Sequence, residues 1–329
     1  MNVGNPTFVE NSPAKQEAKH IFSENLSFKD DEMIKTTARV LPLPVPVHTD
    51  IIQSEADFQV VTTNTNPSHK LVVLKKATDL LSAMYLKPPC PTCTFEPNLQ
   101  RVMKKCLEHS QSRDSIYFDI GANIGIHSLY MAALGYKVVA LEADSDTFGL
   151  FSRSIAENNF FNRILALNVA VTSERADVQM MRNPNNIGNN QIVSATNSTI
   201  GDPTSDLHHI ARGVKLDDLL PFLPPEREIV LKIDIEGHEC YVINKEQATA
   251  LFSSRKIPCI AMEFTPKAMN VDQKCIQDMI SLLTSFGYVP YFAVGKLAAK
   301  KVEVANMYNS VSEDILWIPE NQTIAQYIT

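Results

Sequence analysis

The most informative stretch of the chain is Phe118-Asp-Ile-Gly-Ala-Asn-Ile-Gly125, which follows an apolar run that begins at Ser115. Gly121 and Gly125 allow a strand to turn into a helix close beneath a ligand, and the free N–H groups at the start of that helix can donate to an anionic group. Asn123 stands where a dinucleotide-binding turn has its second glycine, which leaves less room for a pyrophosphate. The turn therefore favours a nucleoside with a short chain over NAD. A tight glycine turn without any ligand is the alternative.

Strand and helix patterns alternate on the C-terminal side of this turn, which is typical of a parallel sheet built from right-handed crossovers. The expected strands span residues 115–120, 137–141, 164–171, 229–235, 258–264, 288–294 and 314–318. The last two are close enough in the chain to pair antiparallel. We therefore expect an α/β, Rossmann-like fold with a seven-stranded, mostly parallel sheet and an antiparallel last strand.

Helical patterns cover residues 75–85, 96–109, 126–134, 145–157, 216–222, 239–252 and 276–283. Ser145 or Asp146 can cap the helix that starts there. One segment breaks the alternation, because residues 176–181 and 191–195 have short strand patterns and a polar stretch follows them to Gly213. We interpret this segment as a hairpin and a mobile loop that shapes a binding pocket.

The composition indicates a globular protein with an N-terminal extension. The 329 residues are 44% hydrophobic, and 30 Lys and Arg against 37 Asp and Glu give a net charge of −7. Nothing global therefore attracts the chain to nucleic acid or to an anionic membrane. Residues 1–66 are polar and contain the proline run 41–46, which suits a flexible extension that is dispensable for folding. Residues 67–329 then form one domain with its core at about 115–318.

The sequence also bears on compartment and metal content. No apolar run reaches the ~18 residues of a spanning helix, and the start of the chain lacks the apolar core of a signal peptide, so we expect a cytoplasmic protein. Six cysteines in so long a chain predict reduced, mostly buried thiols: Cys90, Cys93, Cys106, Cys240, Cys259 and Cys275. Cys90 and Cys93 have the spacing of half a zinc site, which no second pair or nearby histidine completes. We expect no assembled metal site, and the oligomeric state stays open.

An acidic residue ends the second expected strand. Glu142 lies 23 positions after Asp119 of the first strand, and a carboxylate there can accept both hydroxyls of a ribose. An acidic strand end is often simply solvated, but its spacing from the glycine turn strengthens the ribose-binding interpretation. Ala143 and Asp144 would then border the adenine.

A second acidic cluster lies in the run Lys232-Ile-Asp-Ile-Glu-Gly-His-Glu239. Because charges are costly to bury, side chains at the end of this strand should face the ligand crevice of an open α/β sheet. Asp234 and Glu236 are two residues apart, hence on one face if the strand continues, whereas Glu239 suits the first turn of a helix. His238 is a rival base, with an unperturbed pKa near neutrality, although a surface or supporting position is the commoner one.

Other polar residues have simpler interpretations. His127 suits packing or a helix cap, and His208 and His209 suit a solvated loop. Asp217 and Asp218 could bind a metal, but carboxylate pairs are commoner at helix N-termini.

Together these motifs resemble the FkbM family of S-adenosylmethionine-dependent methyltransferases, which have a class I methyltransferase fold. The resemblance rests on residues 117–128, 141–144, 168–170, 215–218, 231–239 and 261–264, and it covers roughly residues 70 to 318. It implies S-adenosyl-L-methionine as the cofactor and a hydroxyl on a sugar or other small molecule as the methyl acceptor. The expected cofactor-binding residues are Asp119, Gly121, Asn123, Gly125, Glu142, Ala143 and Asn168. The expected catalytic residues, any of which could take the hydroxyl proton, are Asp234, Glu236 and His238, and Glu263 could line the pocket.

Two other function classes stay open. An RNA or protein methyltransferase would share the cofactor half, but the chain is acidic and lacks both an Asn/Asp-Pro-Pro-Tyr/Phe motif and an evident RNA-binding appendage, so no nucleic-acid partner is expected. A cofactor-binding module without catalysis is the second class. The intact acidic residues Asp119, Glu142, Asp234 and Glu236 argue against it.

Overall fold

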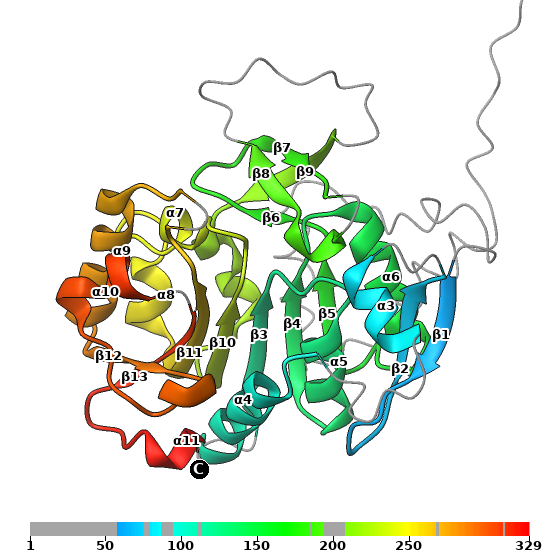
Figure 1. The fold of residues 1–329 in the computed structure, drawn as a ribbon, viewed down its shortest axis with the longest axis horizontal. Coiled ribbons are helices and arrows are strands. Elements are labelled where there is room, and N and C mark those ends of the chain that lie inside the picture. Colours follow the sequence, from blue (N-terminus) through cyan, green and yellow to red (C-terminus); the bar gives the residue numbers. More distant parts are fainter. Residues whose placement is uncertain are drawn as a thin grey trace, which may run out of the picture.

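The structure is a computed structural model and describes residues 58–75, 79–86, 95–110, 114–183, 186–193, 208–267, 270–311 and 313–328. Its centre is a seven-stranded sheet in the order β12-β13-β11-β10-β3-β4-β5 (Figure 1). These strands are β3 (Ile116–Ile120), β4 (Lys137–Leu141), β5 (Ile164–Leu167), β10 (Glu228–Ile233), β11 (Lys256–Phe264), β12 (Tyr288–Phe292) and β13 (Glu313–Pro319). β13 is antiparallel to both of its neighbours, β11 and β12. The expected Rossmann-like sheet with an antiparallel last strand is confirmed.

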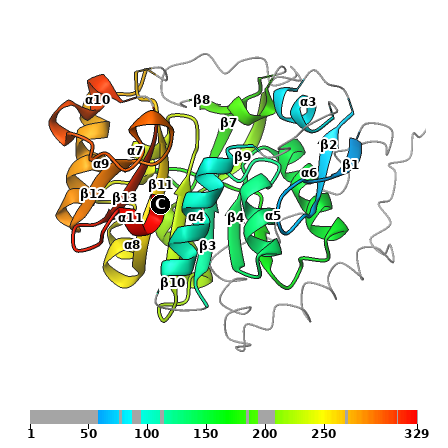
Figure 2. The same ribbon diagram turned by 60° about the horizontal axis from the view of Figure 1, so that its bottom comes forward.

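Helices cover both faces of this sheet, as Figures 1 and 2 show. The principal ones are α4 (Pro97–His109), α5 (Ile126–Ala133), α6 (Ser145–Glu157), η2 (Leu216–Phe222), α7 (Glu239–Val242), α8 (Thr249–Ser254) and α9 (Gln273–Ser285). Alternate side chains of β3 enter the two cores: Phe118 packs with residues of η2, α7, α8 and α9, and Tyr117 packs with residues of α4, α5 and α6. Because every residue of β3 is buried, the strand end that carries the glycine turn is held from both sides.

The folded part begins before residue 67, which corrects the expected boundary of the extension. β1 (Phe58–Thr62) pairs antiparallel with β2 (Lys70–Leu74). The guanidinium carbon of Arg153 on α6 lies 4.5 Å from the centre of the Phe58 ring, and the Val72 N–H donates to Ser154 of α6. Residues 58–74 therefore form a hairpin that packs on α6. Residues 1–57 lie outside the described ranges.

We expect a chain that starts at residue 57 to melt at the temperature of the full chain, and one that starts at Pro67 to melt at least about 5 °C lower. The shorter chain loses β1 and the apolar burial of Phe58 and Val61, worth roughly 2–4 kcal/mol in total for half-buried side chains. Differential scanning calorimetry of the three proteins checks this. Equal melting temperatures for all three would show that β1 contributes nothing to stability.

A second, smaller sheet lies over one end of the main sheet and has the order β6-β9-β7-β8 (Figure 1). Its strands are β6 (Ala170–Val171), β7 (Asp177–Met181), β8 (Gln191–Val193) and β9 (His208–Val214). The predicted hairpin is confirmed as β7 and β8, although the prediction missed β9 in the segment interpreted as a loop. The predicted strand 164–171 divides into β5 and β6, which belong to different sheets.

Several helices differ from their expected bounds. The predicted helix 239–252 is broken into α7 and α8, and α3 spans only Leu80–Leu86. Asp144, rather than Ser145 or Asp146, caps α6, because its carboxylate accepts from the N–H groups of Asp146 and Thr147. The remaining elements are η1 (Ile187–Asn189), η3 (Gly295–Leu297), η4 (Val304–Asn306), α10 (Met307–Ser310) and α11 (Ala325–Ile328). Within the part of the chain that the structure describes, no helix is long and apolar enough to cross a membrane.

Four of the six cysteines form disulfides, which contradicts the expectation of reduced thiols. Cys106 of α4 is joined to Cys259 of β11, and Cys240 of α7 is joined to Cys275 of α9. Spacing in the sequence could not reveal these pairs, because their members are 153 and 35 residues apart. Cys90 and Cys93 lie outside the described residues.

Candidate functional site

The glycine turn after β3 is shaped by contacts with two other elements. Gly121 has φ +83°, and a Cβ atom there would lie 1.8 Å from the carbonyl oxygen of Asp234. Gly125 has φ +86°, and a Cβ atom there would lie 2.0 Å from the Phe151 ring. Any larger side chain would therefore push the turn away from β10 or from α6. Gly125 is required by this packing, and it does not line the cavity described next.

A cavity lies at the carboxyl ends of β3, β4 and β10, which is the usual ligand crevice of an open α/β sheet. It is lined by three groups of residues: from the main sheet and its turns Ile120, Gly121, Asn123, Leu141, Glu142, Ala143, Asp234, Ile235 and Glu236; from the segment after β5 Val169, Ala170 and Val171; and from the β7–β8 hairpin Met180, Ile187, Gly188, Asn190 and Ile192. Six of the ten predicted site residues line it, namely Gly121, Asn123, Glu142, Ala143, Asp234 and Glu236.

Glu142 is held in place by backbone donors on both of its carboxylate oxygens. Oε2 accepts from the Asn123 N–H at 2.8 Å, and Oε1 accepts from the Asp144 N–H at 2.8 Å. Burial and the neighbouring Asp144 raise the pKa of Glu142 to about 7. Since a carboxylate oxygen can accept more than one hydrogen bond, both oxygens can still accept from a ligand in the cavity. The arrangement fits the two hydroxyls of a ribose.

Asn168 and Asp119 support the cavity without lining it. The side-chain amide of Asn168 donates to the carbonyl oxygens of Glu142 and Ala143, at 2.8 and 3.1 Å. Asp119 is fully buried and accepts from the Ser128 hydroxyl at 2.6 Å. In this structure the two side chains therefore hold backbone and helix in place around the cavity, which differs from the direct cofactor contact that we expected of them.

Asp144 does not border the cavity either, which corrects its expected place at the adenine edge. It is buried, and Nε of Arg182 donates to its Oδ2 at 2.8 Å. His209, expected in a solvated loop, lies on β9 with Nε2 3.1 Å from the same oxygen. Burial alone would raise the pKa of Asp144, but His209 and Arg182 hold it below its usual value.

Lys232 is a buried cation that sequence reasoning left without a role. Its ammonium lies 3.2 Å from Oδ2 of Asp234 and 3.6 Å from Oδ1 of Asp119. Burial would lower its pKa, but these two carboxylates and Glu96 raise the pKa well above the usual value. A lysine among the apolar residues 229–233 of β10, two residues before an aspartate, was the available signal. The lysine anchors Asp234 at the edge of the cavity.

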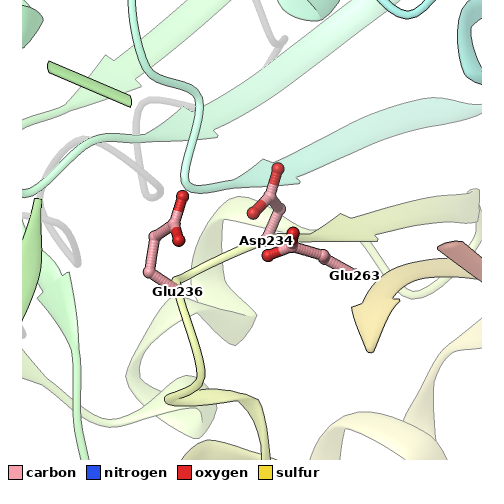
Figure 3. Close-up of side chains that lie close together, drawn as sticks. All are labelled: Asp234, Glu236 and Glu263. Carbon is pink, nitrogen blue, oxygen red and sulfur yellow. The ribbon is translucent and has the colours of Figure 1, made fainter. Parts of the chain in front are cut away.

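Asp234 belongs to a cluster of carboxylates at the ends of the adjacent strands β10 and β11 (Figure 3). Oxygens of Asp234, Glu236 and Glu263 all lie within 4.8 Å of one another. Burial and the Asp234 carboxylate raise the pKa of Glu236 to about 8 and that of Glu263 to about 9. The sequence put Asp234 and Glu236 on one face if the strand continued, but β10 ends at Ile233 and both residues follow it. Glu263, which we expected to line the pocket, lies next to them and is not among the residues that line the cavity.

Oxygen ligands at this spacing are also of the type that hard divalent cations take. We expected no metal site, yet Asp234, Glu236 and Glu263 are the residues that could hold a cation if one binds. The ammonium of Lys232 already supplies one positive charge beside Asp234.

The other acidic and histidine candidates have structural partners. His238 does not line the cavity; its ring centre lies 4.8 Å from that of Tyr241, and burial lowers its pKa to about 4. Glu239 is buried in the first turn of α7 and accepts from the Ile235 N–H. Asp218 forms an ion pair with Arg175, Asp217 accepts from the Leu251 N–H, and His127 pairs with Glu96.

Comparison with known proteins gives a family for this sequence. Residues 119–290, which are 172 of the 329 residues, match the family described as the methyltransferase FkbM domain. Methyltransferase sdnD of Sordaria araneosa is 29% identical over 150 residues, which are 38% of this chain and 58% of that protein. The matched part thus spans little more than half the length of this curated relative.

Solved structures of methyltransferases resemble the chain at low sequence identity. The human methyltransferase 10 domain containing protein matches with a TM-score of 0.40 and 12% identity, covering 73% of this chain and 90% of that one. Precorrin-6y C5,15-methyltransferase from Geobacter metallireducens matches with a TM-score of 0.35 and 12% identity, covering 68% and 93%.

Proposed function

Because this chain belongs to the FkbM methyltransferase family, whose methyl donor is S-adenosyl-L-methionine, we propose that it methylates a hydroxyl group of a sugar or other small molecule. One observation carries the proposal. Glu142, whose carboxylate suits the two hydroxyls of a ribose, lines the same cavity as the carboxylates Asp234 and Glu236. A nucleoside held at Glu142 can therefore extend its reactive end toward groups that accept a proton.

The residues around the cavity suit the cofactor. Glu142 offers its carboxylate to a ribose, and apolar side chains such as Val169, Met180 and Ile192 offer walls to an adenine. Gly121 keeps the floor of the cavity free of side-chain atoms. When bound, S-adenosylmethionine supplies a methyl group on a sulfonium centre that is already activated for in-line displacement.

Asp234 and Glu236 are the proposed catalytic residues. The acceptor hydroxyl has to lose a proton as its oxygen bonds to the methyl carbon and the carbon–sulfur bond breaks, and a nearby carboxylate can take that proton. The Lys232 ammonium fixes Asp234 by a 3.2 Å contact, so the carboxylate needs little reorganisation. His238 stays a weaker candidate because it lies outside the cavity lining.

The carboxylate cluster also favours one class of acceptor. Asp234, Glu236 and Glu263 lie together, and Asp314 pairs with Glu263 across β11 and β13. The same surroundings that raise the pKa of Glu236 and Glu263 disfavour any further negative charge, so a phosphate or carboxylate group of an acceptor is disfavoured there as well. This supports a neutral polyhydroxy acceptor over RNA, in line with the net charge of −7.

Acceptor class can be tested directly with S-adenosylmethionine that carries a labelled methyl group. We expect label to enter the neutral, low-mass fraction of a cell extract, and neither the anionic metabolites nor total RNA. The Asp234→Asn variant is the control for background transfer. Label found mainly in RNA would overturn the proposed acceptor class while leaving methyl transfer in place.

Calorimetry is expected to show micromolar binding of S-adenosylmethionine and S-adenosylhomocysteine and no useful binding of NAD. The turn at Gly121–Gly125 leaves little room for a pyrophosphate, because Asn123 occupies the position of the second glycine of a dinucleotide turn. Tight NAD binding without any response to S-adenosylhomocysteine would reverse the assignment.

The rate of methyl transfer is expected to rise between pH 7 and pH 9. A carboxylate accepts a proton only when it is ionised, and Glu236 and Glu263 have pKa values raised to about 8 and about 9. Ionisation adds negative charge where the hydroxyl proton leaves, so kcat/KM increases as pH rises through these values. Glu236→Gln should remove the part of the rise near pH 8. A flat profile for the unmodified protein would contradict this role.

A further inference from the structure

The β7–β8 hairpin forms one wall of the cofactor cavity. Met180 of β7, Ile192 of β8 and Gly188 of η1 line the cavity together with Glu142 and Ala143. Gly188 also lies close to the glycine turn, since a Cβ atom there would be 2.9 Å from the side-chain nitrogen of Asn123. The hairpin thus lines the cavity and comes close to the glycine turn at Asn123.

At the start of the loop that connects β7 to β8, Arg182 joins the hairpin to α6. Its Nε donates to Oδ2 of Asp144 at 2.8 Å, and its Nη1 lies 2.8 Å from Oδ2 of Asp146. Asp144 caps α6, and its own N–H donates to Glu142. A continuous chain of hydrogen bonds therefore runs from the hairpin through Asp144 to the carboxylate of Glu142.

At the tip of the hairpin, Asp79 provides a second attachment. Its Oδ1 accepts from the Ile187 N–H at 3.1 Å, and its Oδ2 accepts from the Ser82 N–H at the start of α3. Asp79 is buried, with 1% of its surface exposed. The region before the predicted core thus holds the wall of the cavity in place.

We propose that Arg182 and Asp79 are positioning residues that hold the hairpin over bound S-adenosylmethionine and so set the rate at which cofactor and product leave. The inference rests on the cofactor placement proposed above. Arg182 suits this task because its planar guanidinium contacts two carboxylates at once, which the single ammonium of a lysine cannot reproduce. Loss of either attachment lets the hairpin swing away from the cavity and opens a path for the ligand.

The test measures dissociation of radiolabelled S-adenosylhomocysteine during a chase with excess unlabelled ligand. Arg182→Ala is expected to raise the dissociation rate about tenfold, with a smaller change in the association rate, because such contacts act mainly on dissociation. Arg182→Lys should give an intermediate rate, and Asp79→Ala should change the rate in the same direction. The single-turnover rate at saturating cofactor should stay near that of the unmodified protein, because the carboxylates at the reaction centre are untouched.

Arg212→Ala is the matched control. Arg212 lies on β9 of the same small sheet and pairs with Asp177 at 3.0 Å, but both side chains are exposed and neither contacts α6 or the cavity. It should leave the dissociation rate unchanged. An unchanged rate in Arg182→Ala, with or without a lower melting temperature, would overturn the proposal. Glu142→Ala tests the proposed placement of the cofactor separately. If this variant binds S-adenosylhomocysteine as tightly as the unmodified protein does, the cofactor placement is wrong, and the result says nothing against the attachment of the hairpin.

Discussion

Asp234→Asn is expected to lower the single-turnover rate of methyl transfer about 100-fold or more, with a smaller effect on cofactor affinity. Asparagine keeps the shape of the side chain and an oxygen that can accept from Lys232, but it cannot take a proton from the acceptor. In this variant the buried Lys232 ammonium still has the Asp119 carboxylate 3.6 Å away. Because its charge therefore keeps an anionic neighbour, we expect the variant to fold. Rapid-quench measurements with an identified acceptor check the rate, and calorimetry checks the affinity.

Asp314→Asn is the control for this prediction. Asp314 lies on β13 opposite Glu263 and does not line the cavity, and burial raises its pKa to about 7. We expect it to change the rate much less than Asp234→Asn does. If Asp234→Asn instead loses cofactor affinity in step with activity, Asp234 orders the methionine end of the cofactor. The role of base then passes to Glu236 or His238.

Glu142→Ala should weaken binding of S-adenosylhomocysteine at least tenfold. The carboxylate can accept two ribose hydroxyls, and hydrogen bonds to a charged group contribute about 1.5–3 kcal/mol each. The same change also frees the N–H groups of Asn123 and Asp144, which loosens the turn and the start of α6. Both effects act in the same direction, and calorimetric titration measures their sum.

Glu142→Gln separates these two effects. Glutamine keeps one acceptor oxygen for a backbone N–H and loses the charge, so its affinity should lie between those of the unmodified protein and Glu142→Ala. Glu157→Ala removes a glutamate at the exposed end of α6, where it pairs with Lys70, and it should leave binding unchanged. Full affinity in Glu142→Ala would show that the ribose lies elsewhere.

Much of the fold was predictable because it depends on local patterns. The apolar runs at β3, β4, β10 and β11 and the glycine turn are contiguous in the sequence, and parallel strands place their carboxyl ends at one edge of a sheet. Asp234, Glu236 and Glu142 could therefore be assigned to one cavity from their positions at strand ends. The break of the strand 164–171 into β5 and β6 was not predictable, since it depends on pairing of β6 with the distant β9.

Three of the predicted residues stay outside the cavity lining for one physical reason. Asp119, Asp144 and Asn168 carry groups that could bind a cofactor, but each is occupied by a partner far away in the chain or in a neighbouring turn: Ser128, Arg182 and the carbonyl of Glu142. A side chain satisfied in this way supports the cavity instead of lining it. The identity of a residue and its spacing do not show which partner it takes.

The residues at strand ends and the glycine turn thus follow from the order of the amino acids, because strand periodicity and the steric freedom of glycine act within a few residues. The wall of the cavity, the contact of Lys232 with Asp119, the disulfides and the attachment of the β7–β8 hairpin by Arg182 and Asp79 follow only from the folded chain. Each of them joins groups that the sequence separates and that only the packing of the sheet and its helices brings into contact.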